Sequence, residues 1–448
     1  MKHKTLQLLL KTCLSLRLYW CVSLLIVKIS NQGLDLRTTD DNKSIKTQPQ
    51  FNDVPSRPSI IAINKTGLLE DLHAIHRRAA RENVDFPRIF VIPRYVVDIV
   101  GSHFLSEKQK NDFLDRDEWD ETAHGKLNVC WKTILRHLKK RWNASMLVSA
   151  NYSYGNERDA HNAAVEIGLK VIIIYKECFM SKGYSEDLLK VLRRSRKFHG
   201  TKLLLYNSGE VGRQLESGMA RPDQLVVVGS PRFDAYISSS TKLVQIDKCK
   251  IVFFVHDIVP KDFAGYSSIE RDRFDNFSNS QIDFGLCLMT AVAWSFPEIK
   301  FEIKTKVTIA TIEKVEEWSK TVTVPPNLSI VMGGLSEGSL KNCLAAIGFN
   351  TTALVDAMAS GVPIGVLNGD GLSDDIKHYV MDFGRGTMKL SSVQELENWI
   401  SSILSSQDSS GNVHQSIDPK NFDFLIDAVG NADGNASLRA LNEIISAI

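Results

Sequence analysis

Short apolar runs and longer stretches with helical spacing alternate along the first half of the chain. The runs predict strands at 59–63, 89–92, 145–150, 171–175, 202–206 and 224–228. Between them, apolar residues recur at helical spacing and predict helices at 68–81, 131–142, 157–167, 185–196 and 211–217. The run at 171–175 is apolar throughout, as in a parallel strand that is buried on both faces. Strands that alternate with helices predict a parallel α/β sheet for residues 59–236.

The second half repeats this plan after a connection near 236–248. We expect strands at 250–255, 300–304, 328–332 and 387–390, and helices at 312–320, 336–345 and 393–404. A long polar loop is expected after residue 255, and residues 406–448 are expected to form a polar loop and a terminal helix from about residue 437. The predicted fold class is therefore α/β, with two Rossmann-like domains, 59–236 and 249–405. Two such domains face each other across a cleft, where open parallel sheets bind ligands.

The most informative segment runs over 346–364. An apolar run stops at Gly348, and one helix follows, with the strong N-cap residue Asn350 at its start and the C′ residue Gly361 at its end. The turn brings backbone N–H groups, two hydroxyls and the positive end of a helix dipole to the carboxyl edge of a sheet. Phosphates bind at such places. The alternative is an ordinary crossover in which the two threonines are only first-turn residues.

This segment resembles the "GF-x-S/T-T-x-x-x-E/D-A-x-x-x-G-x-P" stretch of GT-B-type glycosyltransferases and of surface-carbohydrate biosynthesis proteins. The resemblance implies that Gly348, Asn350, Thr351 and Thr352 hold the diphosphate of a nucleotide-sugar donor. It also implies that Asp356 faces the ribose of the donor, where such proteins more often carry Glu.

A second stretch, Gly-Ser-Pro-Arg-Phe-Asp at 229–234, resembles the "V-x-G-S-P-R-x-D" motif that closes the acceptor domain in the same group. Similar stretches occur in polyol-phosphate transferases and nucleotide-sugar epimerases. Gly229 lets the chain turn out of its strand, and Pro231 fixes the exit direction. Arg232 can offer a planar fork to an anion of the donor at the cleft. The alternative is a local ion pair between Arg232 and Asp234.

Two further donor-binding candidates lie at strand ends of the second half. Lys304 resembles a lysine that the same group places on the donor phosphates, although many relatives continue with His-Pro where this chain has Thr-Lys. His256 follows the strand at 250–255, in a loop that is often near the donor diphosphate in this group. A single histidine in such a place is also commonly structural.

Sugar transfer needs a base that takes a proton from the acceptor hydroxyl, and a carboxylate within hydrogen-bond range can do so. Glu177 follows the strand at 171–175, and Glu157 and Asp159 follow the strand at 145–150, so all three are placed at the carboxyl edge of the first sheet. We predict Glu177 and Glu157 as the catalytic residues. A solvated surface carboxylate is the alternative for each.

The N-terminal segment is basic. Residues 1–34 contain Lys2, Lys4, Lys11, Arg17 and Lys28 and no Asp or Glu, in a chain whose net charge is only +2. The longest apolar run there, 18–27, is about half the roughly 20 residues that a membrane span needs. Residues 1–30 therefore predict a basic amphipathic segment that lies on an anionic membrane surface. A helix packed on the body of the protein is the alternative, and the polar residues 31–58 predict a linker.

Composition excludes several classes of function. A net charge of +2 gives no basis for nucleic-acid binding, and the seven cysteines without C-x-x-C spacing indicate free thiols. We therefore expect a cytoplasmic protein that contacts the inner face of the membrane. No Walker, G-x-G-x-x-G, H-E-x-x-H or Cys/His metal motif occurs. No metal and no cofactor are expected beyond a nucleotide sugar as substrate.

The resemblance implies a glycosyltransferase of surface polysaccharide biosynthesis. Such an enzyme moves a sugar from a nucleotide-sugar donor to a glycan or lipid-linked acceptor without a metal. One alternative is a polyol-phosphate transferase or nucleotide-sugar 2-epimerase on the same fold. Another is a non-catalytic carbohydrate-assembly protein.

Overall fold

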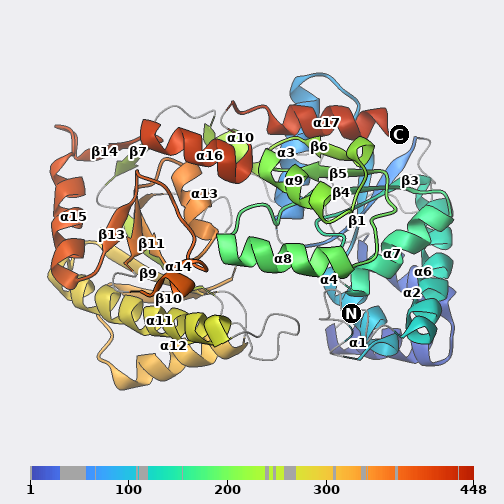
Figure 1. Ribbon diagram of the computed structural model, residues 1–448, viewed down its shortest axis with the longest axis horizontal. Coiled ribbons are helices and arrows are strands. Elements are labelled where there is room, and N and C mark those ends of the chain that lie inside the picture. The colour runs from blue at the N-terminus through green and yellow to red at the C-terminus, as the bar shows by residue number, and fades with distance from the viewer. Residues whose placement is uncertain are drawn as a thin grey trace.

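The chain forms two lobes that lie side by side, each built on a six-stranded parallel sheet (Figure 1). The computed structural model describes residues 3–30, 57–65, 67–106, 109, 120–153, 155–237, 242–245, 249–256, 269–305, 309–333, 340, 342–368, 372–431 and 433–448. The linker expected at 31–58 lies almost wholly outside these residues. The predicted fold class is confirmed: the protein is α/β with two Rossmann-like domains.

The first sheet has the strand order β2-β1-β3-β4-β5-β6. Its strands are β1 (Ser59–Ile63), β2 (Arg88–Ile92), β3 (Ala144–Ser149), β4 (Lys170–Tyr175), β5 (Lys202–Leu205) and β6 (Leu225–Val227). The connecting helices are α3 (Leu68–Arg81), α4 (Arg94–Phe104), α6 (Glu121–Trp142), α7 (Gly155–Glu166), α8 (Lys182–Arg194) and α9 (Ser208–Glu216). All the strands and helices predicted for this half are present, because each buried strand is apolar and each helix presents an apolar face to it.

The second sheet has the order β10-β9-β8-β11-β12-β13. Its strands are β8 (Lys250–Phe254), β9 (Lys300–Thr305), β10 (Leu328–Met332), β11 (Cys343–Gly348), β12 (Ile364–Leu367) and β13 (Met388–Leu390). The helices of this lobe are α11 (Ile269–Ser295), α12 (Ile309–Thr321), α13 (Ala353–Ala359), α14 (Asp374–Lys377), α15 (Val393–Ser405) and α16 (Phe422–Val429). A separate antiparallel pair joins β7 (Lys242–Gln245) to β14 (Asn412–Gln415).

Three predictions for the second half are wrong. Much of the polar loop expected after residue 255 is the helix α11, which buries Phe274, Ile282, Leu286 and Met289. The helix expected at 336–345 is contradicted from residue 343 onward, where β11 begins, and 336–339 lie outside the described residues. The loop expected before the terminal helix contains β14 and α16. Polar residues dominate the first half of α11 and hid its apolar spacing.

The N-terminal segment forms two helices, α1 (His3–Ser15) and α2 (Tyr19–Ser30), which contact α4 and α6 of the first lobe. Leu10, Leu14, Val22 and Ile26 are fully buried in the core of that lobe. The alternative stated above, packing on the body of the protein, is therefore what the structure shows. None of the described helices is both long and apolar enough to cross a bilayer.

The C-terminal part of the chain crosses back from the second lobe to the first. Leu425 and Val429 of α16 belong to the core of the second lobe. The helix α17 (Ala436–Ser446) lies on the first lobe beside α3, and its Leu441 and Ile444 join the core of that lobe (Figure 1). The two lobes are thus connected by two chain segments, one before β8 and one between α16 and α17.

Candidate functional site

Each sheet has one point at which its strand order reverses. This point lies between β1 and β3 in the first sheet and between β8 and β11 in the second. Open parallel sheets bind ligands outside the carboxyl ends of their strands at such points. In the second lobe, the two loops at this point hold His256 and the turn 348–352. The structure therefore brings together two of the predicted donor-binding segments.

The turn 348–352 is built differently from the prediction. Asn350 is not the N-cap of the helix, because α13 begins at Ala353 with Thr352 in the N-cap position. Asn350 has a left-handed backbone, with φ of 49°. Its side-chain amide donates to the carbonyl of Tyr379 (3.2 Å), and its Oδ1 accepts from the amide of Met381 (2.6 Å). Asparagine is favoured both as an N-cap and in a left-handed backbone conformation. At position 350 it serves the second role, which is why the N-cap prediction failed.

The start of α13 remains open to solvent. Thr352 is exposed, whereas Thr351 is buried and its Oγ1 accepts a long hydrogen bond from the amide of Ala353 (3.4 Å). Gly348 packs closely on this turn, because a Cβ there would lie 3.0 Å from Cγ2 of Thr351. The helix has only seven residues. An anion could approach its first turn from the side of Thr352.

Lys304 lies in line with this turn across the sheet. Phe254 pairs with Lys304 on one side and with Gly348 on the other, so the two residues are two strands apart, about 10 Å between Cα atoms. Burial lowers the pKa of Lys304, and the charge of Glu302 partly opposes this shift. The side chain of Lys304 is 8% exposed. Lys304 therefore lies near the switch point, and its contact with the donor phosphates stays a prediction.

His256 contacts the turn through its aromatic neighbour. Its ring lies edge-on to Phe349, with the centroids 5.5 Å apart, and its Nε2 is 2.6 Å from Oγ of Ser278 on α11. The side chain is buried. His256 thus packs against the turn 348–352, and its predicted contact with the donor stays a prediction.

Arg232 connects the two lobes. Its Nε lies 3.5 Å from Oδ1 of Asp356 on α13, and its Nη1 donates to the hydroxyl of Tyr206 (3.2 Å). Its backbone amide donates to Oδ1 of Asp71 in the first turn of α3 (3.1 Å). Burial alone would lower the pKa of Arg232, but Tyr206, Asp356 and Asp71 outweigh it and hold the pKa above its ordinary value. The two sequence motifs that carry the resemblance therefore meet at one place.

Of the two carboxylates around Arg232, Asp71 is fully buried and Asp356 is largely buried. Burial raises the pKa of Asp71 to about 6, against the opposing effect of Arg232. Burial also raises the pKa of Asp356, again opposed by Arg232. Asp356 was predicted to face a ribose, and in this structure it faces Arg232. The ribose contact stays a prediction.

Gly67 lets the first lobe approach Arg232. It precedes α3 with φ of 87°, a conformation that side chains rarely adopt. A Cβ at this position would lie 2.8 Å from Nη1 of Arg232 and 3.8 Å from Cδ of Lys176. Sequence reasoning did not identify Gly67, Asp71 or Tyr206 as site residues. Gly67 and Asp71 follow the end of the first strand, and this position is the signal in the sequence that could have identified them.

The candidate bases of the first lobe have different surroundings. Glu157 is fully buried; it forms an ion pair with Arg94 and accepts from Oγ of Ser149 (2.7 Å). A carboxylate without access to solvent does not meet a bound acceptor, so Glu157 supports the fold here. Glu177 is half-buried, and its charge acts on Lys65 at the end of β1. Burial, with help from Lys176 and Arg94, lowers the pKa of Lys65 to about 6. A group that titrates near neutral pH is suited to proton transfer, and sequence reasoning missed this lysine.

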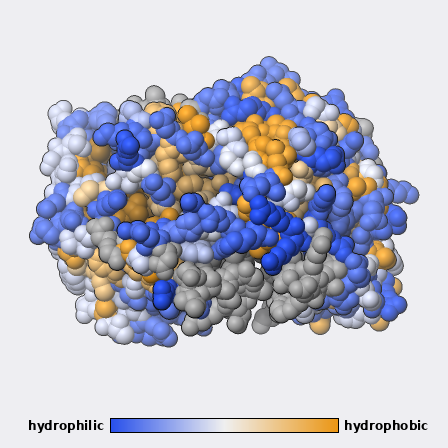
Figure 2. All heavy atoms as spheres, viewed as in Figure 1, coloured by the Kyte–Doolittle hydropathy of each residue, from blue (hydrophilic) through white to orange (hydrophobic). Residues whose placement is uncertain are grey.

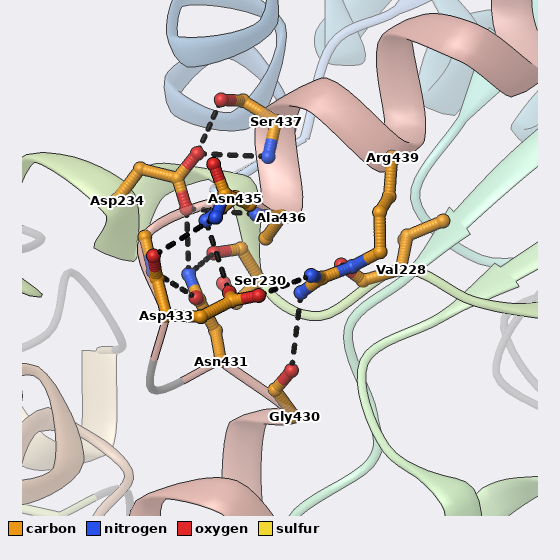
Figure 3. Close-up of polar contacts among 11 residues, drawn as sticks. Val228, Ser230, Asp234, Gly430, Asn431, Asp433, Asn435, Ala436, Ser437 and Arg439 are labelled. Carbon is orange, nitrogen blue, oxygen red and sulfur yellow. Dashed lines mark hydrogen bonds and ion pairs between the residues drawn. The ribbon is translucent and has the colours of Figure 1, made fainter.

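Asp234 does not pair with Arg232, so the alternative stated for these two residues is wrong. Its carboxylate accepts from the amides of Ala436 (3.0 Å) and Ser437 (2.8 Å) at the start of α17 (Figure 3). It also accepts from the side chains of Asn431 (2.7 Å) and Ser437. This residue of the closing motif therefore caps the helix that returns from the second lobe.

Comparisons with known proteins give only distant likenesses. No family model matches the chain, and no curated protein matches its sequence. Among solved structures, UDP-GlcNAc 2-epimerase from Neisseria meningitidis bound to UDP-GlcNAc is 11% identical, with a TM-score of 0.46 over 87% of this chain and 100% of that chain. UDP-GlcNAc 2-epimerase from Methanocaldococcus jannaschii is 11% identical, with a TM-score of 0.45 over 87% and 99%. MurG from Acinetobacter baumannii is 10% identical, with a TM-score of 0.37 over 87% and 100%. These values are too low to assign a family.

Proposed function

We propose that the protein binds a nucleotide sugar between its two lobes and transfers the sugar to a glycan or lipid-linked acceptor in surface polysaccharide biosynthesis. The observation that carries this proposal is the meeting of Arg232, from the closing motif of the first lobe, with Asp356, on the helix after the 348–352 turn. These are the two motifs on which the resemblance rests. They meet where the second sheet presents its switch point.

In this proposal the donor diphosphate lies before the first turn of α13. Thr352 and Thr351 offer hydroxyls, and Lys304 offers a cation two strands away. A phosphate oxygen would replace the carboxylate of Asp356 at the guanidinium of Arg232, since both are oxyanions that a planar fork can bind. Cations at the diphosphate would offset the charge that develops on the leaving group as the glycosidic bond breaks.

The acceptor is placed on the first lobe. Glu177 and Lys65 lie at the carboxyl ends of β4 and β1, on the edge of the sheet where Arg232 also lies. We assign to Glu177 the removal of the proton from the acceptor hydroxyl. No metal and no further cofactor have a part in this mechanism.

A second candidate function is a non-catalytic carbohydrate-assembly protein that kept the fold. One observation favours it: the charge of Arg232 is already balanced by Asp71 and Asp356, and both polar ends of the Asn350 amide are used in hydrogen bonds. A site with its charges satisfied has less to gain from an anionic ligand. Ligand binding separates the two candidates.

The test is a thermal-shift panel of UDP, GDP and CDP and their sugar conjugates on the full chain. A ligand at about 100 times its Kd stabilises the folded state by about 2.7 kcal/mol, which shifts the melting temperature by a few degrees. Thr352→Ala and Lys304→Met should abolish the shift, whereas the control variants Thr323→Ala and Lys320→Met, at exposed positions of the same lobe, should keep it. No shift with any nucleotide at millimolar concentration contradicts the proposal and supports the non-catalytic candidate.

Product analysis with a labelled donor then separates the enzymatic alternatives. Sugar transfer releases a nucleoside diphosphate, polyol-phosphate transfer releases a nucleoside monophosphate, and 2-epimerisation returns an altered nucleotide sugar. Nucleotide binding followed by either of the last two products would overturn glycosyl transfer while keeping the site.

A further inference from the structure

The α1–α2 hairpin is fixed firmly to the first lobe. Arg17, two residues after the end of α1, has a left-handed conformation with φ of 56°. The amide of Leu18 donates to the carbonyl of Cys13 (2.8 Å), and that of Arg17 donates to the carbonyl of Leu14 (2.9 Å). These two bonds form a Schellman motif, which sets the angle between the helices. The outer surface of the hairpin is therefore a defined part of the folded protein.

This outer surface carries an unusual amount of exposed apolar area. Among the described residues, sixteen large apolar side chains are exposed, and six of them lie on this hairpin, four on its two helices and two in the turn between them. The six are Leu8 (66% exposed), Leu9 (40%), Leu16 (63%), Leu18 (38%), Trp20 (53%) and Leu24 (45%). We call these six side chains the outer face of the hairpin. Packing in the core of the first lobe explains why the inner face of the hairpin is apolar. It does not explain why apolar side chains also cover the outer face.

Positive charges dominate around the outer face. Lys11, Arg17 and Lys28 are exposed on the hairpin, and residues 1–34 contain no Asp or Glu. The helix α6, against which α2 packs, adds six cations and a single carboxylate, Glu121. The apolar patch visible over α9 and β6 differs, because α9 carries both Glu216 and Arg213 (Figure 2). Within the described parts of the chain, the hairpin itself combines exposed aliphatic and indole side chains with cations and no carboxylate.

We propose that the outer face of the hairpin binds the surface of an anionic phospholipid bilayer. Leucine and tryptophan side chains insert at the boundary between headgroups and acyl chains, and lysine and arginine bind the anionic headgroups. The hairpin lies in the interface and does not span the membrane. It contacts α4, which begins with Arg94 at the carboxyl edge of the first sheet. The proposal stands on the hairpin alone and does not depend on nucleotide binding.

The test measures binding of the full chain to vesicles by flotation. We expect binding to vesicles that contain phosphatidylglycerol, little binding to phosphatidylcholine alone, and a loss of binding as salt rises. Leu16→Ser with Trp20→Ser should weaken binding by about tenfold or more, since both side chains insert. Trp294→Ser is the matched control, because Trp294 on α11 is 54% exposed and Trp20 is 53% exposed.

A second pair of variants tests the charges. Lys11→Gln with Arg17→Asn removes two cations, and asparagine keeps the left-handed turn at position 17. This pair should weaken binding severalfold, whereas Lys320→Gln with Lys420→Gln, exposed on the second lobe, should not. Equal binding to neutral and anionic vesicles, or unchanged binding by the Trp20 variant, would overturn the proposal. It would also be overturned if the chain ignored vesicles and formed a dimer that the Leu16 and Trp20 substitutions dissociate.

Discussion

Glu210 is a carboxyl group that the first lobe buries completely. Its Oε1 accepts from the side chain of Gln214 (2.6 Å), and it forms an ion pair with Arg213. Tyr152 donates to Gln214 in turn (2.8 Å). Burial raises the pKa of Glu210 to about 7, although Arg213 and Gln214 oppose the shift. The folded protein therefore holds a proton here that the unfolded chain releases at lower pH.

This difference predicts how stability depends on pH. The pKa of about 7 in the folded state lies above the ordinary value of 4.5, so the folded state binds more protons between these two pH values. The free energy of unfolding should therefore fall as the pH rises from about 4.5 to 7. Glu210→Gln removes the titrating group and should flatten this slope, as measured by urea unfolding at several pH values. Asp71 adds a similar slope only up to about pH 6. An unchanged slope between pH 6 and 7 in the variant would contradict the assignment.

Gly67 allows a prediction about the contact with Arg232. Gly67→Ala meets both an unfavourable backbone conformation and the guanidinium of Arg232. Gly218→Ala is the matched control, because Gly218 also has a positive φ (65°) but nothing lies within 4 Å of its added Cβ. The control should cost about 1–2 kcal/mol of unfolding free energy, and Gly67→Ala should cost clearly more. Equal losses of unfolding free energy in the two variants would contradict this prediction, because they would show that the side chain of Arg232 moves aside without an energetic penalty.

The residue-scale site could be predicted only in part. Gly348, Thr352 and His256 could be placed at strand ends near the switch point because strand ends and a short motif are local signals, and their contact with a donor stays a prediction. The partners of Arg232 were not found, since Asp71, Tyr206 and Asp356 come from three distant parts of the chain. The burial of Glu157 could not be predicted either, because it depends on how α4 packs and brings Arg94 into an ion pair with Glu157.

At the scale of elements, one aspartate determines how α17 begins. Asp234→Ala would leave the amides of Ala436 and Ser437 without this acceptor. We expect a loss of about 2–4 kcal/mol in unfolding free energy, more than for a surface cap, because the site is buried. Asp433→Ala is the control in the same cluster; its exposed ion pair with Arg439 (2.8 Å) should contribute at most about 1 kcal/mol. Chemical denaturation measures both. A similar loss in the two variants would contradict the buried cap.

Helices and strands were predicted well where apolar residues recur at regular helical spacing or form one continuous run. The bounds of α3 follow its apolar spacing, and β4 follows its continuous apolar run. The helix α11 was missed because Asn, Ser and Asp occupy much of its first half, although its buried residues still recur three or four positions apart. The strand β14 was missed because it gains its hydrogen bonds from β7, far away in the sequence. The strand conformation of β14 is thus determined by its tertiary pairing with β7 and not by the local preference of its residues.

At the scale of the whole molecule, α8 holds the two lobes together. The amide of Gly183, in its first turn, donates to the carbonyl of His378 in the second lobe (2.8 Å). The hydroxyl of Tyr379 donates to Asp187 (2.9 Å), and Glu186 lies 2.9 Å from Nε2 of His378. No pattern in the sequence indicated this contact. Besides the contact of Arg232 with Asp356, closure of the two lobes therefore depends on a small patch around one glycine.

Gly183→Ala tests this closure. A Cβ at position 183 would lie 2.8 Å from Cδ1 of Tyr379 and 2.9 Å from Cδ2 of His378. The ring of Tyr379 cannot move aside easily, because it packs edge-on against Tyr184 and its hydroxyl is bonded to Asp187. The added methyl should therefore push the lobes apart and cost about 1–3 kcal/mol of unfolding free energy. The expected result in small-angle X-ray scattering is a larger radius of gyration.

Gly212→Ala is the matched control, since nothing lies within 4 Å of a Cβ at that helical position. It should leave the radius of gyration unchanged and stabilise the protein by up to about 1 kcal/mol. If Gly183→Ala also leaves the radius unchanged, the contact yields locally and α8 does not set the distance between the lobes. If the radius of gyration of Gly183→Ala increases, the distance between the lobes can be changed without substituting Arg232 or Thr352. Donor binding in that variant would then measure how far the proposed site depends on both lobes.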